Sequence, residues 1–271
     1  FDDVMGPHDD TASYHVHWFF PGVYRRRWPK PTVHEYTSLS TGSWRGGKDL
    51  AKRLFNARPD RRIFLNSDVE KGLGFRDGIS SSLRDMGVPA DFFRPAPEGP
   101  REFDFFYAGS IVPERGLVTF LDALKSGDVE GSILLVGAPA AEITSRFQNE
   151  TRIQFAGRVP QDEIPRLAAR ATYALNLVPD SAPFNLQAST KLIEYCAMRL
   201  KVISTSYHWV NSFARQRNAR FFTFSERAPR LKAAELRAFH FHTPTVDDLE
   251  WSQVIERANL TGILRGLARG E

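Results

Sequence analysis

The sequence contains one cysteine and no long apolar run. Because Cys196 stands alone among 271 residues, an intramolecular disulfide and a cysteine-based metal cluster are excluded, and we expect a reducing, cytoplasmic setting. No run of about 18 apolar residues occurs, so no membrane-spanning helix is expected. The chain begins with Phe1-Asp2-Asp3-Val4, which is neither a signal peptide nor an initiator methionine, so we expect the true N-terminus to be missing.

A strong excess of charge is also absent. The 36 Lys and Arg residues and 32 Asp and Glu residues give a formal net charge of +4, which is too weak and too dispersed to indicate a nucleic-acid partner. The densest basic cluster is Arg25-Arg26-Arg27-Trp28, followed by Lys30. Such a cluster either docks on anionic lipid headgroups with Trp28 at the interface or forms a solvated loop. The first alternative predicts peripheral contact with the inner face of a membrane.

Proline marks a boundary along the chain. Four prolines and one glycine fall within residues 89–100, a density that excludes a helix or a central strand. We predict an interdomain linker there. The expected parts are an N-terminal domain at 1–95, a second domain at 101–245 and a terminal helical segment at 246–271.

Beyond this linker, short apolar runs alternate with amphipathic stretches. The runs predict strands at 103–108, 133–136, 153–156, 173–178, 201–205 and 221–224, with helices expected at 115–125, 140–148, 162–170 and 191–200. This alternation predicts an α/β fold with a parallel, doubly wound sheet. Ligands bind beyond the carboxyl ends of strands in such sheets, where Gly109, Gly137 and Gly157 fall. The N-terminal part is less regular, with strands expected at 15–20, 32–36 and 63–66 and helices within 48–56 and 68–86.

The segment Ser189-Thr190-Lys191 begins one of the predicted helices. Helix N-termini present unpaired backbone N–H groups and the positive end of the helix dipole, so they can bind phosphate, and Lys191 adds a full charge. Glu194, one turn further on, is a suitable acceptor for the two hydroxyl groups of a ribose. The alternative is structural, because Ser and Thr commonly cap helices and an acidic residue in the first turn is favoured by the dipole alone.

The order of these segments resembles the donor domain of GT-B glycosyltransferases, especially the large retaining group that uses a glutamate on this helix. The resemblance runs from about residue 103 to 224. It is carried by the strings Ala108-Gly109-Ser110, Arg115-Gly116-Leu117, Leu134-Leu135-Val136-Gly137, Phe155-Ala156-Gly157-Arg158-Val159-Pro160, Lys191-Leu192-Ile193-Glu194-Tyr195 and Lys201-Val202-Ile203-Ser204-Thr205.

The resemblance implies two Rossmann-like domains that face a cleft, with the N-terminal domain reduced or truncated and the terminal helix packed back toward it. It also implies roles for individual residues in binding a nucleoside-diphosphate sugar, with no cofactor and no metal. Arg115, Lys191 and helix dipoles would stabilise the diphosphate. Backbone at Gly109 would approach it, Glu194 would bind the ribose, Arg158 and Val159 would flank the base, and Ser189 and Thr190 would meet phosphate or sugar.

Two positions depart from the family pattern. Ser110 stands where many relatives have a basic residue after the first glycine, and Leu186 stands where many have a second glutamate. Asn185, Gln187 or Asp180 would then have to supply the sugar contacts. These departures leave the donor sugar and the retaining mechanism open.

The N-terminal half carries a weaker likeness. Val33-His34-Glu35 resembles a strand whose terminal histidine faces the donor, which makes His34 a candidate cleft residue. Glu35 is a candidate general base if the enzyme inverts, because a carboxylate must then take the acceptor's proton. For both residues a structural role is the alternative.

The function implied is transfer of a hexosyl group from a nucleoside-diphosphate sugar to a hydroxyl group of a glycan, lipid-linked intermediate or small molecule, in polysaccharide or glycoconjugate biosynthesis. The alternatives are a GT-B-like epimerase or phosphorylase, and a sugar-nucleotide-binding subunit without catalytic activity.

Overall fold

The computed structural model describes residues 15–20, 22–40, 42, 44–94, 99–112, 116–182 and 184–270. The chain separates into two compact units, of which the first comprises Phe1–Asp85 with Ser252–Glu271 and the second comprises Met86–Trp251. Each unit has a parallel sheet with helices packed against it, which confirms the predicted α/β class with two parallel sheets. The N-terminal segment of the first unit ends at Asp85, ahead of the linker expected at 89–100.

The first unit has a four-stranded sheet in which the spatial order of the strands follows the chain. These strands are β1 (His17–Phe19), β2 (Thr32–Tyr36), β3 (Arg61–Phe64) and β4 (Ser81–Leu83). Its helices are α1 (Arg45–Phe55), α2 (Ser67–Leu73), α10 (Leu260–Arg269) and most of α9 (Trp251–Arg257).

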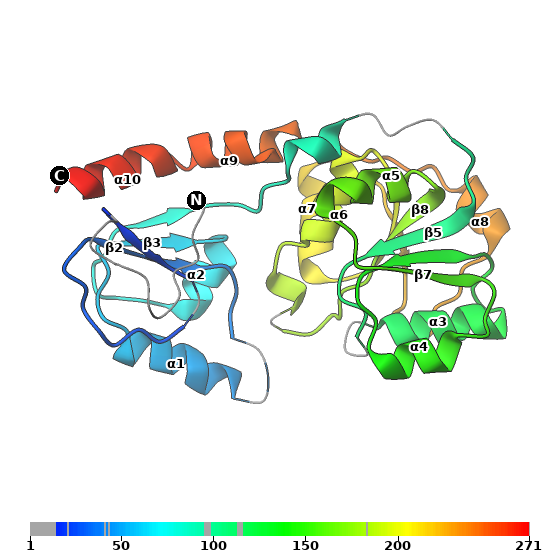
Figure 1. Ribbon diagram of the computed structural model, residues 1–271, viewed down its shortest axis with the longest axis horizontal. Coiled ribbons are helices and arrows are strands. Elements are labelled where there is room, and N and C mark those ends of the chain that lie inside the picture. The colour runs from blue at the N-terminus through cyan, green and yellow to red at the C-terminus, as the bar shows by residue number, and fades with distance from the viewer. Residues whose placement is uncertain are drawn as a thin grey trace. The chain divides into compact units, whose positions relative to one another are not determined.

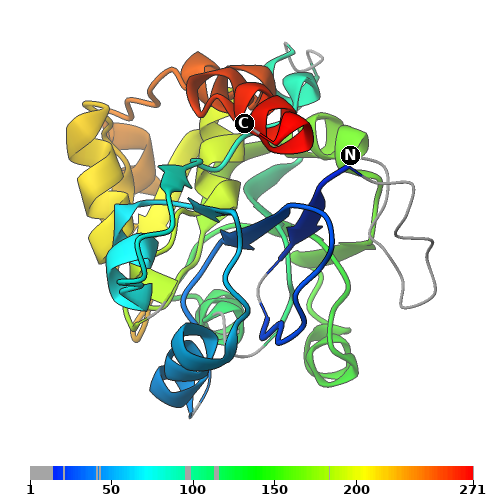
Figure 2. The same cartoon turned by 90° about the vertical axis from the view of Figure 1, so that its left-hand side faces the viewer.

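This strand order determines how the first sheet is covered. Parallel strands joined in sequence by right-handed crossovers place every connecting helix on the same face. Figures 1 and 2 show α1 and α2 on one side of the strands and α10 on the other. On the α10 side, Leu260 packs with Val33 and Ile63 in a small apolar cluster. The terminal segment therefore supplies the cover that the crossovers cannot.

The second unit has a six-stranded sheet. In spatial order its strands are β10 (Phe222–Phe224), β9 (Lys201–Thr205), β8 (Ala171–Asn176), β5 (Phe103–Ala108), β6 (Ile133–Val136) and β7 (Ile153–Gly157). The chain builds outward from β5 on one side, then returns to build outward from β8 on the other. This reversal makes the sheet doubly wound and creates a topological switch point between β5 and β8.

Helices cover both faces of the second sheet. They are α3 (Leu117–Ser126), α4 (Ala141–Phe147), α5 (Ile164–Ala168), α6 (Thr190–Ala197), α7 (His208–Gln216) and α8 (Ala233–Ala238). Figure 1 shows α3 and α4 beneath the strands and α5 and α6 above them. Successive β5 side chains point to opposite faces of the sheet. Phe105 contacts Phe120 of α3 at a ring-centroid distance of 5.5 Å, and Phe106 contacts Tyr195 of α6 at 6.1 Å.

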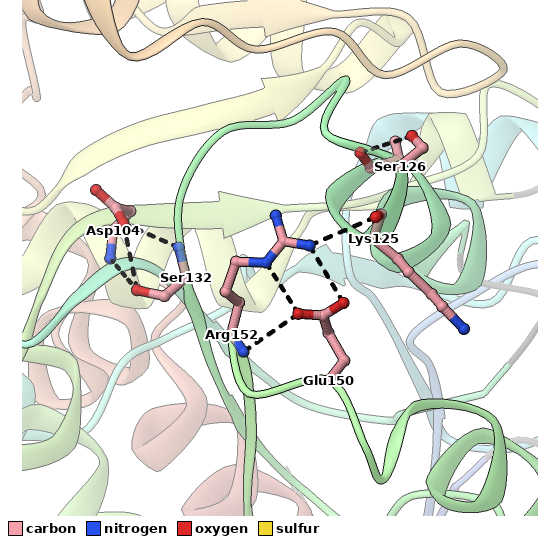
Figure 3. A network of polar contacts seen from close by, with 7 residues as sticks. Asp104, Lys125, Ser126, Ser132, Glu150 and Arg152 are labelled. Carbon is pink, nitrogen blue, oxygen red and sulfur yellow. Dashed lines mark hydrogen bonds and ion pairs between the residues drawn. The ribbon is translucent and has the colours of Figure 1, made fainter.

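The amino ends of β5, β6 and β7 are fixed by polar contacts (Figure 3). Asp104 accepts hydrogen bonds from the backbone N–H of Ser132 at 2.9 Å and from its hydroxyl group at 3.2 Å. Arg152 pairs with Glu150 and donates to the carbonyl oxygen of Lys125. These hydrogen bonds and this ion pair occupy the amino edge of the sheet with structural contacts. A ligand site is therefore expected at the carboxyl edge.

A buried ion pair ties together three strands of the first unit. Glu35 of β2 is 2% exposed and accepts a hydrogen bond from the indole N–H of Trp18 in β1 at 2.9 Å. Arg84, which follows β4 and is also buried, donates to the other carboxylate oxygen. A buried carboxylate is stable only when it is paired and hydrogen-bonded, and here both oxygens are satisfied.

Loss of this pairing should destabilise the protein. Arg84→Met leaves Glu35 as an uncompensated buried charge and should lower the free energy of unfolding by ~3–5 kcal/mol. Arg61→Met is the matched control, because Arg61 hydrogen-bonds Ser82 and the carbonyl oxygen of Ser81 without a carboxylate partner; its cost should be ~1 kcal/mol. Urea unfolding followed by tryptophan fluorescence measures both. Equal losses of unfolding free energy in the two variants would show that the Glu35–Arg84 ion pair contributes no more to stability than the hydrogen bonds of Arg61.

Candidate functional site

Two glycine turns follow β5, at the switch point of the second sheet, and its neighbour β6. Gly109 follows β5 with φ +139°, and Gly137 follows β6 with φ +145°, both in the region that favours glycine. The backbone N–H of Gly109 donates to the carbonyl oxygen of Val136 at 2.9 Å. A Cβ atom on Gly137 would lie 2.0 Å from the carbonyl oxygen of Gly109, so no larger residue fits. The carboxyl end of β5 is thus bare backbone beside a close turn.

Lys191 of α6 lies against this backbone. Its Cδ atom is 3.3 Å from the position that a Cβ on Gly109 would take. Its ammonium group donates to the hydroxyl group of Tyr107 at 3.1 Å and lies 4.3 Å from the centre of the Tyr107 ring. Tyr107 in turn donates to the carbonyl oxygen of Ser110 at 2.9 Å. A positive charge is therefore held at the glycine turn that ends β5.

A buried hydrogen-bond network fixes the start of α6. The hydroxyl group of Ser189 donates to the side-chain oxygen of Asn176 at 2.8 Å and accepts from the backbone N–H of Leu192. Asn176 is fully buried at the end of β8 and donates to Ser204 at 2.9 Å and to Tyr207 at 3.1 Å. Since the only hydroxyl proton of Ser189 is directed at Asn176, its role here is to cap the helix. Thr190 and Lys191 then form the first turn.

Glu194 is one turn further along α6 and is only 8% exposed. Burial raises the pKa of its carboxyl group to about 7, while Lys191 and a hydrogen bond with Gln161 act in the opposite direction. Gln161 follows β7, so this contact joins α6 to the segment expected to line a base. A carboxylate with so raised a pKa is typical of functional sites, because stability alone would favour its replacement.

The remaining donor-side candidates surround these groups. Arg158 is exposed and Val159 is half-buried, directly after Gly157 at the end of β7. Asn185 donates to Asp180 at 3.1 Å, and its own side-chain oxygen is buried with no hydrogen-bond partner among the described residues, as is the side-chain nitrogen of Gln187. Arg115 lies outside the described residues.

Several site residues were not anticipated from the sequence. Tyr107 positions Lys191, Gln161 contacts Glu194, and Asn176 holds the helix start. Asn176 did carry a signal, because an asparagine inside an otherwise apolar strand must find buried partners. Tyr107 and Gln161 carried none, since their partners are 84 and 33 residues away in the chain.

The two N-terminal candidates lie on opposite faces of β2. His34 is in the middle of the strand, 3% exposed, and packs against Phe19, Tyr24 and Tyr36. Burial, aided by the charge of Arg62, lowers its pKa to about 4, so it is neutral at pH 7. Glu35 is occupied by Arg84 and Trp18. The structure therefore gives no support to His34 as a strand-end residue or to Glu35 as a general base.

Arg25, Arg26 and Arg27 are exposed, and Trp28 is half-buried. The guanidinium group of Arg25 lies 5.2 Å from the ring centre of Phe55, and that of Arg26 lies 4.9 Å from the Trp28 ring. Among the described residues, no group of three or more His, Cys, Asp or Glu side chains is placed to hold a metal ion. In the same part of the chain, no helix is long and apolar enough to cross a bilayer.

The raised pKa of Glu194 predicts a pH-dependent stability. The pKa rises from an ordinary 4.5 to about 7 on folding, so between these values the folded state holds more protons than the unfolded state and stability falls as pH rises. Glu194→Gln removes this titration. The variant should melt at a higher temperature than the unmodified protein at pH 8 and at a similar temperature at pH 4. A difference in melting temperature that does not change with pH would contradict the burial of an ionisable Glu194.

Comparison with known proteins identifies the fold. No protein-family model and no curated protein matches the sequence. Among solved structures, sucrose-phosphate synthase from Thermosynechococcus elongatus matches 96% of this chain and 75% of its own, with a TM-score of 0.65 and 12% identity. A glycosyltransferase from Rickettsia africae matches 96% and 76%, with a TM-score of 0.57 and 16% identity. HepE from Anabaena, solved in complex with UDP, matches 89% and 72%, with a TM-score of 0.56 and 13% identity. The chain thus has the GT-B fold of these glycosyltransferases.

Proposed function

We propose that this chain is a glycosyltransferase that moves a hexosyl group from a nucleoside-diphosphate sugar to a hydroxyl acceptor, in polysaccharide or glycoconjugate biosynthesis. The observation that carries the proposal is the arrangement along α6. Lys191 lies at the bare backbone of Gly109, and the buried Glu194 follows one turn later, both at the switch point of a doubly wound sheet. A cation and, one helical turn later, a carboxylate that can accept hydrogen bonds from hydroxyl groups suit a diphosphate joined to a ribose.

In this proposal each part of the donor has its own site. The diphosphate lies at Gly109, Ser110 and the first turn of α6, with Thr190, Lys191 and Arg115 meeting its charge. The ribose hydroxyl groups donate to Glu194, and Arg158 and Val159 flank the base. The sugar faces the loop that carries Asn185. Negative charge grows on the diphosphate as the bond to the sugar breaks, and a fixed lysine and a helix dipole stabilise that charge without a metal ion.

Binding without catalysis is the second candidate, favoured by one observation. The loop before α6 presents the amides of Asn185 and Gln187 where the family often has a glutamate, and Leu186 occupies that position. A labelled nucleotide sugar offered with a panel of hydroxyl acceptors separates the two candidates. Transfer or hydrolysis supports the enzyme, whereas binding with no turnover for any acceptor supports a sugar-nucleotide-binding subunit.

Donor affinity should depend on the ionisation of Glu194. The probe is the tightest binder from a panel of nucleotide sugars, whose diphosphate diester does not titrate near neutrality. Because only the carboxylate accepts two ribose hydroxyl bonds, a pKa of about 7 predicts affinity that rises roughly tenfold from pH 6 to pH 8. Glu194→Gln should bind at least tenfold more weakly at pH 8, with a flat profile.

The control for this titration is Glu163→Gln, which removes a half-buried carboxylate on the neighbouring short turn. Among the described residues, this carboxylate forms an ion pair with Arg166 alone. Calorimetric titration at each pH measures all three proteins. A pH profile unchanged by Glu194→Gln, in a folded variant, would rule out the ribose role.

We also propose peripheral contact with an anionic membrane through Arg25, Arg26, Arg27 and Trp28. Helix α1 supports this proposal because it carries exposed apolar side chains beside basic ones. Leu54 is 65% exposed and Phe55 is 52% exposed, with Arg25 stacked on the latter. Amphipathic helices that combine such residues lie in the headgroup region of bilayers.

Membrane contact should fail when this surface is made acidic. The double variant Leu54→Asp with Phe55→Asp should lower cosedimentation with phosphatidylglycerol vesicles at least fivefold. Two apolar side chains that would enter the bilayer are lost, and the added carboxylates weaken the attraction to anionic lipid. Leu83→Asp, on the edge strand β4 and 47% exposed, is the control and should bind normally. Binding of the unmodified protein should also weaken at 0.5 M salt. Equal binding to neutral and anionic vesicles would refute the contact.

A further inference from the structure

A pocket of about 370 Å³ opens in the first unit, away from every group used above for the donor. Its walls come from the loop before β2, from β2 itself and from the turns that precede β3 and β4. The lining residues used here are Arg27, Trp28, His34, Arg58, Asp60 and Ile79. The volume is near the lower end of the range for small-ligand sites, which is room for a small phosphorylated compound.

The pocket lies at the amino edge of the first sheet. Asp60 directly precedes β3, Ile79 lies two residues before β4, and Thr32 is the first residue of β2. Ligands of open α/β sheets ordinarily bind at the opposite, carboxyl edge, at a reversal of strand order. Among the strands that the structure describes, the first sheet has no such reversal. The pocket is therefore not the acceptor or donor position that the fold itself would suggest.

Positive charge collects on the rim of this pocket. Arg26, Arg27 and Arg58 all line it, and within the described ranges none of the three forms an ion pair with a carboxylate. Arg58 also donates to the backbone carbonyl oxygen of Asp77 at 2.5 Å. The acidic residue of the lining, Asp60, is engaged by the backbone N–H of Thr32 at 2.7 Å and by its hydroxyl group at 3.2 Å. Planar guanidinium groups recognise phosphate oxygens by paired hydrogen bonds.

The inner wall is polar and incomplete. His34 is 3% exposed, and its Nδ1 atom is buried with no hydrogen-bond partner in the described part of the chain. A buried ring nitrogen in this state is rare in folded proteins and calls for a partner. Asp60 beside it would repel a bare anion but accepts hydrogen bonds from hydroxyl groups, and Trp28 and Ile79 offer apolar contact to CH groups.

From this arrangement we propose that the pocket binds the phosphate ester of a small polyol. The phosphate lies between the arginines of the rim, and the polyol hydroxyl groups reach Asp60 and His34. A bare phosphate ion fills too little of the space and leaves the inner wall unpaired. The same ester occurs free in solution and as the headgroup of an anionic phospholipid, and both sources present the same chemistry.

Calorimetric titration with glycerol 3-phosphate, inorganic phosphate and glycerol tests the free source. The ester should bind more tightly than either part, and Arg58→Gln should weaken it at least tenfold through loss of a charged hydrogen bond. Arg76→Gln is the matched control, since Arg76 is an exposed arginine of the same unit outside the pocket. His34→Phe keeps the packing volume and should lower affinity for the ester more than for inorganic phosphate.

Cosedimentation with phosphatidylglycerol vesicles tests the headgroup source, with the same pair of arginine variants. Weaker binding by Arg58→Gln than by Arg76→Gln in either assay supports the pocket and identifies which source it uses. Equal behaviour of the two variants in both assays, or inorganic phosphate binding as tightly as the ester, overturns the proposal. Nucleotide-sugar binding should be unchanged in Arg58→Gln, so failure here is separate from failure of the donor site.

Discussion

The arrangement of the candidate site depends on the hydrogen bonds made by the side-chain amide of Asn176. It is fully buried at the end of β8 and reaches Ser189, Ser204 and Tyr207 by hydrogen bonds of 2.8 to 3.1 Å. These partners begin α6, end β9 and precede α7. One amide thus fixes where two helices start relative to two strands. Because an unpaired buried amide is costly, the network has essentially one arrangement.

The positions of Lys191 and Glu194 follow from this fixed helix start. Two residues into α6 the lysine reaches the glycine turn of β5, and one further turn brings the glutamate to Gln161. Neither placement serves stability. The glutamate is buried against its preference, as its raised pKa shows, and the close approach of the two glycine turns leaves no room for a side chain at Gly137. Groups held at such a cost at a switch point are what a binding site requires.

The sequence indicates the second sheet far better than the first because its strands are buried on both faces. The continuous apolar runs of Phe103–Ala108, Ile133–Val136 and Lys201–Thr205 have the bounds that the runs predict. Strand β4 reads Ser-Ser-Leu on an exposed edge, so no apolar pattern announces it. Helices α7 and α8 were missed because each buries few apolar side chains, Val210 and Phe213 in the first and Leu236 in the second.

Site residues divide in the same way. Lys191 and Glu194 could be placed together on one helix from the sequence because their spacing is local. The surroundings of His34 and Glu35 could not, because adjacent strand residues face opposite ways and the sequence does not say which face is buried under what. The partner of Glu35 is Arg84, 49 residues further along the chain, and no local pattern connects them. Whether a carboxylate is a candidate general base or part of a structural ion pair depends on such long-range pairing, which local sequence propensity does not show.

The difference in winding between the two sheets explains what each unit contains. In the second, helices cover both faces and the strand order reverses between β5 and β8. In the first, consecutive strand order leaves one face for α10, which covers Val33 and Ile63. The opposite face carries His34 and Arg62 among aromatic rings, and Arg62 donates from its two terminal nitrogens to the carboxylate of Asp77 at 2.6 Å. The Nδ1 atom of His34 and both ring nitrogens of His17 are buried with no hydrogen-bond partner among the described residues, so the protein alone does not supply partners for these two rings.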